Sequence, residues 1–226
     1  GLVELTDVDD PWGAYLYVTT GTLTNAIGGT IASLSGAGGP RYIDAEITNE
    51  GTISVDQSLT IENYVTTFTS TAGTINVAAG NVLTISSGTT VLASATVLSG
   101  PGTGTMDLAG THTLELVSDL TLLPTGTQIT FSGNVTVNGP GMLINQTTLD
   151  LSSDTINADV LNYGTFQVYY YNSINGALTT TATSVIRLEG NSSYGASSLT
   201  VANGFTNSGL VELTDVDDPW GAYLYV

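Results

Sequence analysis

A glycine-led strand motif recurs along this chain and constrains its fold more than any other feature. A Gly is followed by a small or apolar residue and then by alternating residues, as in GTIAS at Gly29, GTISV at Gly51 and GTINV at Gly73. The other members are GLVEL at Gly1, GTMDL at Gly104, GTQIT at Gly126, GMLIN at Gly141, GTFQV at Gly164, a degenerate SVIRL at Ser184, and GLVEL again at Gly209. The motif defines nine units averaging about 23 residues, the size of one coil of a β-solenoid.

Each unit carries further strand signals. Asn precedes several of the glycines, as in Ile47-Thr-Asn49, and marks a turn. Short alternating runs follow the glycine strands: LTI at 59–61 and 83–85, LEL at 114–116, LDL at 149–151 and LTV at 199–201. Period-two alternation is typical of half-buried strands, and no long stretch has helical spacing. We therefore predict an all-β fold, a parallel β-helix (β-solenoid) with about nine coils, with a β-sandwich as the alternative.

The longest repeat in the chain is exact. GLVELTDVDDPWGAYLYV occupies residues 1–18 and returns unchanged at residues 209–226, a period of 209 − 1 = 208 residues. We expect residues 1–208 to form one β-solenoid repeat and residues 209–226 to begin the next. Because a stack of coils without capping sequences can continue, we expect neighbouring identical repeats to be joined covalently along one long array.

The charge of the chain limits its partners and its setting. Twenty acidic residues stand against two arginines, Arg41 and Arg187, and the formal net charge is −18. Nucleic acid is an unsuitable partner for such a surface. An array of these repeats repels itself unless salt or divalent cations screen it, so we expect an extracellular or cell-surface setting and lateral fibre contacts through divalent cations. The sequence has no cysteine and no apolar run long enough to predict a membrane span.

The Asn/Gly corners followed by Thr and an alternating apolar strand resemble the coil repeats of bacterial parallel β-helix surface proteins, of the filamentous-haemagglutinin and autotransporter-passenger type. The resemblance extends over the whole chain. It implies a right-handed parallel β-helix, export to the cell surface, and a role in adhesion or as a rigid stalk. The exact recurrence after 208 residues and the insertions between coils depart from these families.

The stretch TDVDDPWGA at 6–14 carries the candidate metal ligands. Asp7, Asp9 and Asp10 lie within four residues beside a Pro and a Gly, and carboxylate oxygens at this density suit Ca²⁺. The alternative is a solvated acidic turn, because a familiar calcium loop starting at Asp7 would need an oxygen ligand at Pro11 and a Glu at Val18. We expect Trp12 to anchor this loop on the coil.

Other segments give weaker signals. SGAGGPR at 35–41 lacks the residues of a phosphate loop and is predicted to be a flexible insertion. If the run is extended, the rings of Tyr169, Tyr170 and Tyr171 point to alternate sides of the strand. The alternatives for these rings are a cross-coil aromatic ladder, sugar stacking and packing on a neighbouring filament. Three sequons, at Asn134, Asn145 and Asn191, permit glycosylation.

Groups suited to catalysis are scarce. His112 is the only histidine and is expected at the surface, and the chain has no Cys or Lys. We predict no enzymatic activity, with polysaccharide degradation as a remote alternative because parallel β-helices include such enzymes. The expected function is a structural repeat of a long extracellular fibre, stalk or sheath protein. The alternative is a multivalent adhesin whose loops bind glycans or another surface.

Overall fold

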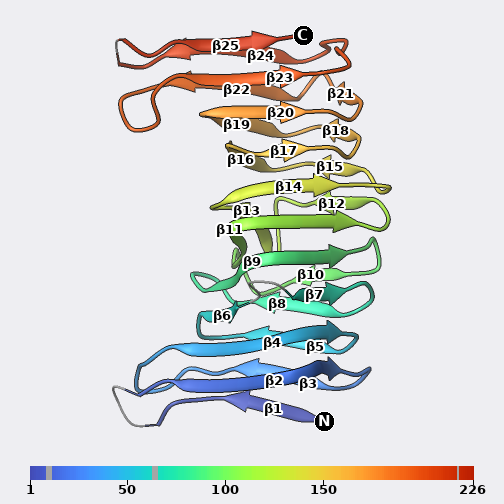
Figure 1. The fold of residues 1–226 in the computed structure, drawn as a ribbon, viewed down its shortest axis with the longest axis vertical. Coiled ribbons are helices and arrows are strands. Elements are labelled where there is room, and N and C mark those ends of the chain that lie inside the picture. Colours follow the sequence, from blue (N-terminus) through green and yellow to red (C-terminus); the bar gives the residue numbers. More distant parts are fainter. Residues whose placement is uncertain (9–11, 63–65, 218) are drawn as a thin grey trace. The chain divides into compact units, whose positions relative to one another are not determined.

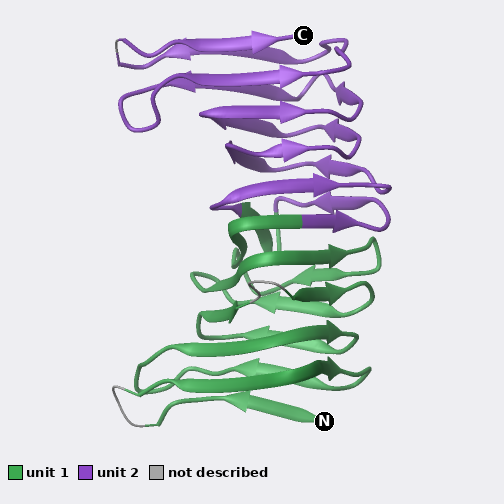
Figure 2. Cartoon of the chain, in the orientation of Figure 1, with its two compact units in different colours: residues 1–113, 125–130 green, residues 114–124, 131–226 purple. Residues whose placement is uncertain are grey.

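The computed structural model describes residues 1–8, 12–62, 66–217 and 219–226, which form 25 strands and no helix. The strands are parallel and stack as a β-solenoid of about nine turns, which confirms the predicted fold. By its contacts the chain divides into two compact units, shown in Figure 2. Unit 1 comprises Gly1–Thr113 and Thr125–Thr130, and unit 2 comprises Leu114–Pro124 and Phe131–Val226.

Unit 1 contains one complete parallel sheet and part of another. The first sheet has the order β1 (Leu2–Leu5), β3 (Thr30–Ser33), β5 (Thr52–Val55), β8 (Thr74–Val77), β10 (Val97–Ser99). The second contains β2 (Ala14–Asn25), β4 (Arg41–Asn49), β6 (Leu59–Glu62), β7 (Thr67–Ser70), β9 (Val82–Leu92), β11 (Thr105–Leu116) and β13 (Gln128–Phe131). The two ends of β4 pair with β6 and β7 separately, so this sheet supplies two sides of each coil.

Alternation explains the core of unit 1. Ile31, Ile53 and Ile75 occupy equivalent positions in three successive coils and are fully buried. In β5 and β8 the polar residues on either side of the isoleucine are only half-buried. In Figure 1 the near strands β2 and β4 run to the right and the far strand β1 runs to the left as the chain rises, so the coils wind in a right-handed sense. Each coil thus contributes one layer to a continuous apolar column.

Unit 2 has three sheets, one for each side of a coil. Their strand orders are β12 (Leu120–Leu122), β15 (Leu143–Asn145), β18 (Val160–Asn162), β21 (Leu178–Thr180); then β16 (Thr148–Ser152), β19 (Thr165–Tyr169), β22 (Val185–Gly190), β24 (Leu210–Asp215); and β14 (Asn134–Asn138), β17 (Thr155–Ile156), β20 (Tyr171–Ile174), β23 (Ser197–Val201), β25 (Ala222–Tyr225). Leu149, Phe166 and Ile186 form a buried column like that of unit 1. Each coil of unit 2 therefore has three sides.

Three members of the glycine motif lie in a different sheet from the one that the pattern predicts. The first sheet of unit 1 continues through β10, whereas GTMDL at Gly104 begins β11, and Thr105 donates to the carbonyl of Asn81. GTQIT at Gly126 forms β13, which pairs with β11. GMLIN at Gly141 forms β15, and the strand equivalent to β19 in the preceding coil is β16. The alternating pattern is the same on all three sides, so it does not identify the side.

Candidate functional site

The segment that recurs in the sequence has two different neighbours in the structure. Its copy at residues 1–18 forms β1, which pairs with β3 of the following coil, with Leu2 opposite Thr30. Its copy at residues 209–226 forms β24, which pairs with β22 of the preceding coil, with Leu210 opposite Val185. The same sequence is therefore bonded along one edge in one copy and along the other edge in the other copy.

The two copies use different backbone atoms for these bonds. In the first copy the carbonyls of Gly1 and Leu5 accept from Thr30 and Leu34, both at 2.9 Å. In the second copy the amides of Leu210 and Val216 donate to the carbonyls of Ser184 and Gly190 at 2.9 and 3.1 Å. Leu210 and Val216 correspond to Leu2 and Val8, so neither set of bonds blocks the other. One copy is able to make both sets at once, as a central strand of a parallel sheet does.

The second strand of the segment behaves in the same way. In the first copy the Ala14 amide donates to the Pro40 carbonyl at 2.9 Å, and in the second the Gly221 carbonyl accepts from Ser197 at 3.0 Å. Gly221 corresponds to Gly13. A Cβ on Gly13 would lie 2.2 Å from the Pro40 carbonyl oxygen, so glycine is required for the following coil to approach.

Equivalent side chains of the two copies differ in exposure because the first copy is covered by the following coil and the second copy by the preceding coil. Leu5, covered by the following coil, is 3% exposed, and its equivalent Leu213 is 48% exposed. Trp12 is 80% exposed, so the expectation that it anchors the loop is wrong for this copy. Its equivalent Trp220 is 39% exposed and has ring carbons 3.6 Å from where a Gly195 Cβ would lie. The surface that receives this Trp belongs to the preceding coil.

Arg41 organises the loop that was predicted to be flexible. Its guanidinium is buried and donates to the carbonyls of Leu34, Gly38 and Gly39 at 2.8 to 3.3 Å. Asp7 is buried below this loop, and its carbonyl accepts from the Ala37 amide at 2.9 Å. The flexible-insertion prediction is therefore wrong: a buried cation that satisfies several carbonyls fixes the glycine-rich turn.

The calcium prediction falls partly outside the described residues, because Asp9 and Asp10 are not among them. Within the described ranges, no three acidic or histidine side chains are grouped to hold a metal ion. In the second copy Asp217, the equivalent of Asp9, accepts from the amide of Ser192 at 2.6 Å and from its hydroxyl. One acid of the run therefore has a structural role between coils, and the calcium site stays a prediction.

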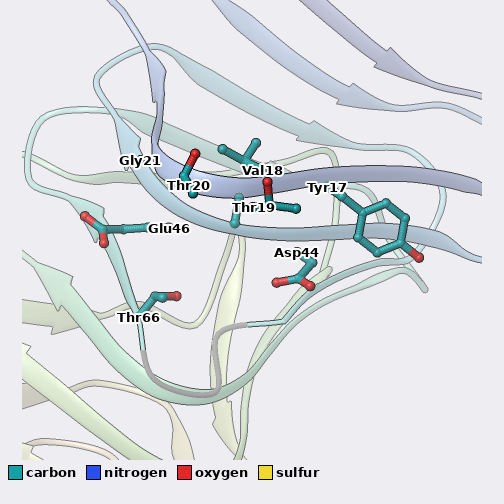
Figure 3. Close-up of a pocket in the computed structure, with 9 residues that line it drawn as sticks. Tyr17, Val18, Thr19, Thr20, Gly21, Asp44, Glu46 and Thr66 are labelled. Carbon is teal, nitrogen blue, oxygen red and sulfur yellow. The ribbon is translucent and has the colours of Figure 1, made fainter.

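Tyrosines and a hollow lie at the end of the first copy. Tyr15, Tyr17 and Tyr42 form a cluster on the outer face of β2 and β4, with ring centroids 5.9 to 6.3 Å apart. Beside it β2 bulges between Tyr17 and Thr22, because four residues of β2 face one residue of β4. Figure 3 shows the resulting hollow of about 450 Å³, lined by Tyr17, Val18, Thr19, Thr20, Gly21, Asp44, Ala45, Glu46 and Thr66. Carboxylates beside a tyrosine can accept hydrogen bonds from hydroxyl-bearing ligands.

His112 is buried, which contradicts the surface position predicted for it. Its Nε2 lies 2.9 Å from the Thr90 hydroxyl, and burial lowers the pKa of His112 to about 4. The hydrogen bond to Ala109 and the charge of Asp107 oppose this shift without reversing it. At neutral pH the ring is uncharged, and it packs within the core of unit 1.

The fold and this segment define the class of the protein as a parallel β-solenoid with a recurring coil. Comparisons with protein-family models, with curated proteins and with solved structures give no match. No helix among the described residues has the length and hydropathy needed to cross a membrane.

Sequence reasoning missed several residues that matter at these sites. Arg41 and His112 share the parity of inward residues, Arg41 with Ile43 and His112 with Leu114, so strict alternation would have placed both inside. Asp217 and Tyr194 lie in loops, where no periodicity applies.

Of the three sequons, the one at Asn145 is not presented for glycosylation by the folded coil. Asn145 is fully buried and bonded to Asn162 at 2.9 Å.

Proposed function

We propose that this chain is a structural repeat of a long extracellular fibre, stalk or sheath protein whose coils stack from one repeat to the next. The observation that carries the proposal is the use of complementary backbone atoms by the two copies of the recurring segment. A segment placed between residues 184–201 of one repeat and residues 30–49 of the next satisfies both edges. The resemblance to filamentous-haemagglutinin and autotransporter-passenger repeats supports the same role.

Side-chain complementarity adds to this support. Glu212 pairs with Arg187 of the preceding coil at 2.6 Å, although an exposed pair of this kind contributes little stability. Asp7 is buried under the Arg41 loop of the following coil, whereas its equivalent Asp215, which has no following coil, is exposed. In a continuous array the exposed Leu213 and the exposed Trp12 would both acquire their missing neighbours. Burial of apolar surface then favours the stacked state.

Hydrogen exchange in a two-repeat chain tests the proposal. The chain consists of residues 1–226 followed by a second copy of residues 19–226, so that the middle copy of the segment has both neighbours. Alternate amides of a parallel strand bond to opposite neighbours. We expect the amides of Val211 and Leu213 to exchange much more slowly in the two-repeat chain than in the single chain. The amides of Leu210 and Glu212 are the internal control and should be protected in both.

Equal exchange of Val211 and Leu213 in the two chains would contradict the proposal, because separate repeats would leave this edge open. The single chain and the two-repeat chain carry the same segment, so only the added neighbour differs.

A multivalent adhesin is the second candidate function. The tyrosine cluster at Tyr15, Tyr17 and Tyr42 and the adjoining acidic hollow favour it, because aromatic faces beside hydrogen-bond acceptors suit a polar ligand. Repetition along a rod would convert weak contacts into firm attachment. The two functions are compatible, since the same rod would both span a distance and display its surface.

A further inference from the structure

A second hollow, of about 410 Å³, lies entirely within unit 2. Its lining combines aromatic rings with short polar side chains and one carboxylate: Phe131, Ser132, Gly133, Asn134, Asp150, Ser152, Ser153, Tyr169, Tyr170 and Tyr194. It contains no Lys or Arg. This volume falls within the usual range for small-ligand sites. The absence of a cation in this lining and the net negative charge of the chain disfavour an anionic ligand.

Three tyrosines form one wall of the hollow. The rings of Tyr169 and Tyr194 stack with centroids 4.3 Å apart, and Tyr170 meets Tyr194 edge-on at 5.5 Å. Tyr170 and Tyr194 both remain partly exposed. Tyrosine rings present large, rigid apolar faces, and a sugar ring carries an apolar face of carbon-bound hydrogens that packs on them.

The backbone at the hollow is held in an unusual conformation. Tyr170 has φ of 53° and Ser153 has φ of 69°, two of the three positive values among described residues other than glycine. Both residues stand at the corner where the chain turns between two sheets. Gly or Asn would occupy such a corner at lower cost, and backbone strain of this kind concentrates at ligand sites. A tyrosine there places an aromatic ring at the edge of the hollow.

The loop that carries Tyr194 is braced from two directions. Within the loop, Asn191 Oδ1 accepts from the amides of Ser193 and Tyr194 at 3.0 and 2.9 Å, and Asn191 and Gly195 exchange backbone bonds. From the next coil, Asp217 accepts from Ser192, and Trp220 covers Gly195. Such bracing lowers the entropy lost when a ligand binds.

From these observations we propose that the hollow at Tyr169, Tyr170 and Tyr194 binds an uncharged sugar unit of a polysaccharide. The tyrosine faces pack on the sugar ring, and Asp150 accepts hydrogen bonds from its hydroxyls. Asp217 and Trp220 are positioning residues, and both belong to the recurring segment. Each hollow is therefore completed by the beginning of the next repeat. The site deepens the adhesin function and rests on the fibre function only for its repetition along a rod.

Binding of neutral oligosaccharides to the 226-residue chain tests this inference. The probes are gluco-, manno- and galacto-oligosaccharides, with hyaluronan fragments as the anionic probe, screened on an array and then titrated by calorimetry. We expect at least one neutral probe to bind and the anionic probe not to bind. Tyr194→Ala and Asp150→Ala should each weaken binding about tenfold, the loss of one good contact.

The matched control is Tyr171→Ala, which removes an exposed neighbouring ring that does not line the hollow and should change the affinity less than about twofold. Tyr194→Phe retains the ring face and should restore most of the binding that Tyr194→Ala loses. Because all of these measurements use the single chain, their failure is separable from failure of the stacking test.

Each of the following results would overturn the inference. The first is the absence of neutral-sugar binding at millimolar concentration. The second is binding that Tyr194→Ala and Asp150→Ala leave unchanged, or a preference for hyaluronan. The third is self-association of the chain, measured by sedimentation, that Tyr194→Ala abolishes, because the hollow would then be a contact between copies.

Discussion

His112 and Asp154 are buried ionisable groups whose environments shift their pKa values in opposite directions. Burial lowers the pKa of His112 to about 4 and raises the pKa of Asp154 to about 6. In Asp154 two backbone amides, of Val135 and Ser152, donate to the carboxylate at 2.7 Å and partly oppose the effect of burial. Each group therefore makes the stability of the fold depend on pH.

We predict that acid destabilises the wild-type chain relative to His112→Gln. The folded-state pKa of His112 lies below its unfolded value, so the unfolded state binds the proton first and stability is lost as the pH falls below about 6.5. The loss should reach about 2 kcal/mol at pH 5. Denaturant unfolding of both proteins at pH 7.5 and pH 5 measures it. Asp154 is common to both proteins and cancels, and a constant difference between them would contradict the prediction.

Replacing Asp154 by Asn should destabilise the chain at pH 7.5 by about 2 kcal/mol, because the amide group would face a backbone donor in a buried site. Because the pKa of Asp154 is raised in the folded state, its contribution to the free energy of unfolding of the wild-type chain is greatest below about pH 4. This contribution decreases as the pH rises through about 6. Asp159→Asn is the control: Asp159 is exposed and accepts from Ala177, a bond that Asn retains. Equal unfolding free energies for the two variants would refute this assignment.

At the scale of elements, ladders of asparagines join successive coils, and two of them in unit 2 can be compared directly. In the buried ladder Asn145 donates to Asn162 Oδ1 at 2.9 Å and to the Thr165 carbonyl at 3.2 Å. In the exposed ladder Asn157 donates to Asn138 at 2.8 Å. The geometry of the two ladders is similar, but only the buried one lacks water as an alternative partner.

We predict that Asn145→Leu lowers the free energy of unfolding by about 2 to 3 kcal/mol. The change removes the donor to the Asn162 side-chain oxygen and the Thr165 carbonyl and leaves both acceptors unpaired away from water. Asn157→Leu, the matched change in the exposed ladder, should cost less than about 1 kcal/mol because water replaces the lost bonds. Urea unfolding of the two variants measures the difference. Similar losses would mean that burial does not govern the contribution of these ladders.

The sequence predicts the elements well and their assignment to sides of the coil less well. Alternation identified the runs at 59–61 and 149–151, which lie in β6 (Leu59–Glu62) and β16 (Thr148–Ser152), because inward and outward residues differ in polarity. It did not place GTMDL, because the three sides share one pattern. The hollow at Tyr194 was unpredictable because it depends on Asp150, Tyr170 and Tyr194, which belong to different coils and become neighbours only when the coils stack.

At the scale of the whole molecule, charge governs how neighbouring copies of this chain would meet. One repeat, residues 1–208, carries 20 − 4 = 16 acidic residues and two arginines, a net charge of −14. Like-charged rods repel over about 10 Å at 0.1 M salt. Contact between their sides therefore requires screening or bridging cations.

We predict that a chain of several repeats associates laterally on addition of millimolar Ca²⁺ at low ionic strength and disperses when a chelator is added. Light scattering measures the association. A chain in which Asp7, Asp9 and Asp10 are all replaced by Asn distinguishes a specific clip from general screening, since only a clip at these residues would be lost. Bundles that survive the chelator at low ionic strength would exclude divalent bridging.

Continuous stacking from repeat to repeat is the central claim, and electron cryo-microscopy of a multi-repeat chain tests it most directly. Nine coils spaced about 4.8 Å apart predict an axial repeat of roughly 43 Å. We expect a continuous rod with this repeat and with strands running across its axis. Separate beads joined by variable links would contradict the claim.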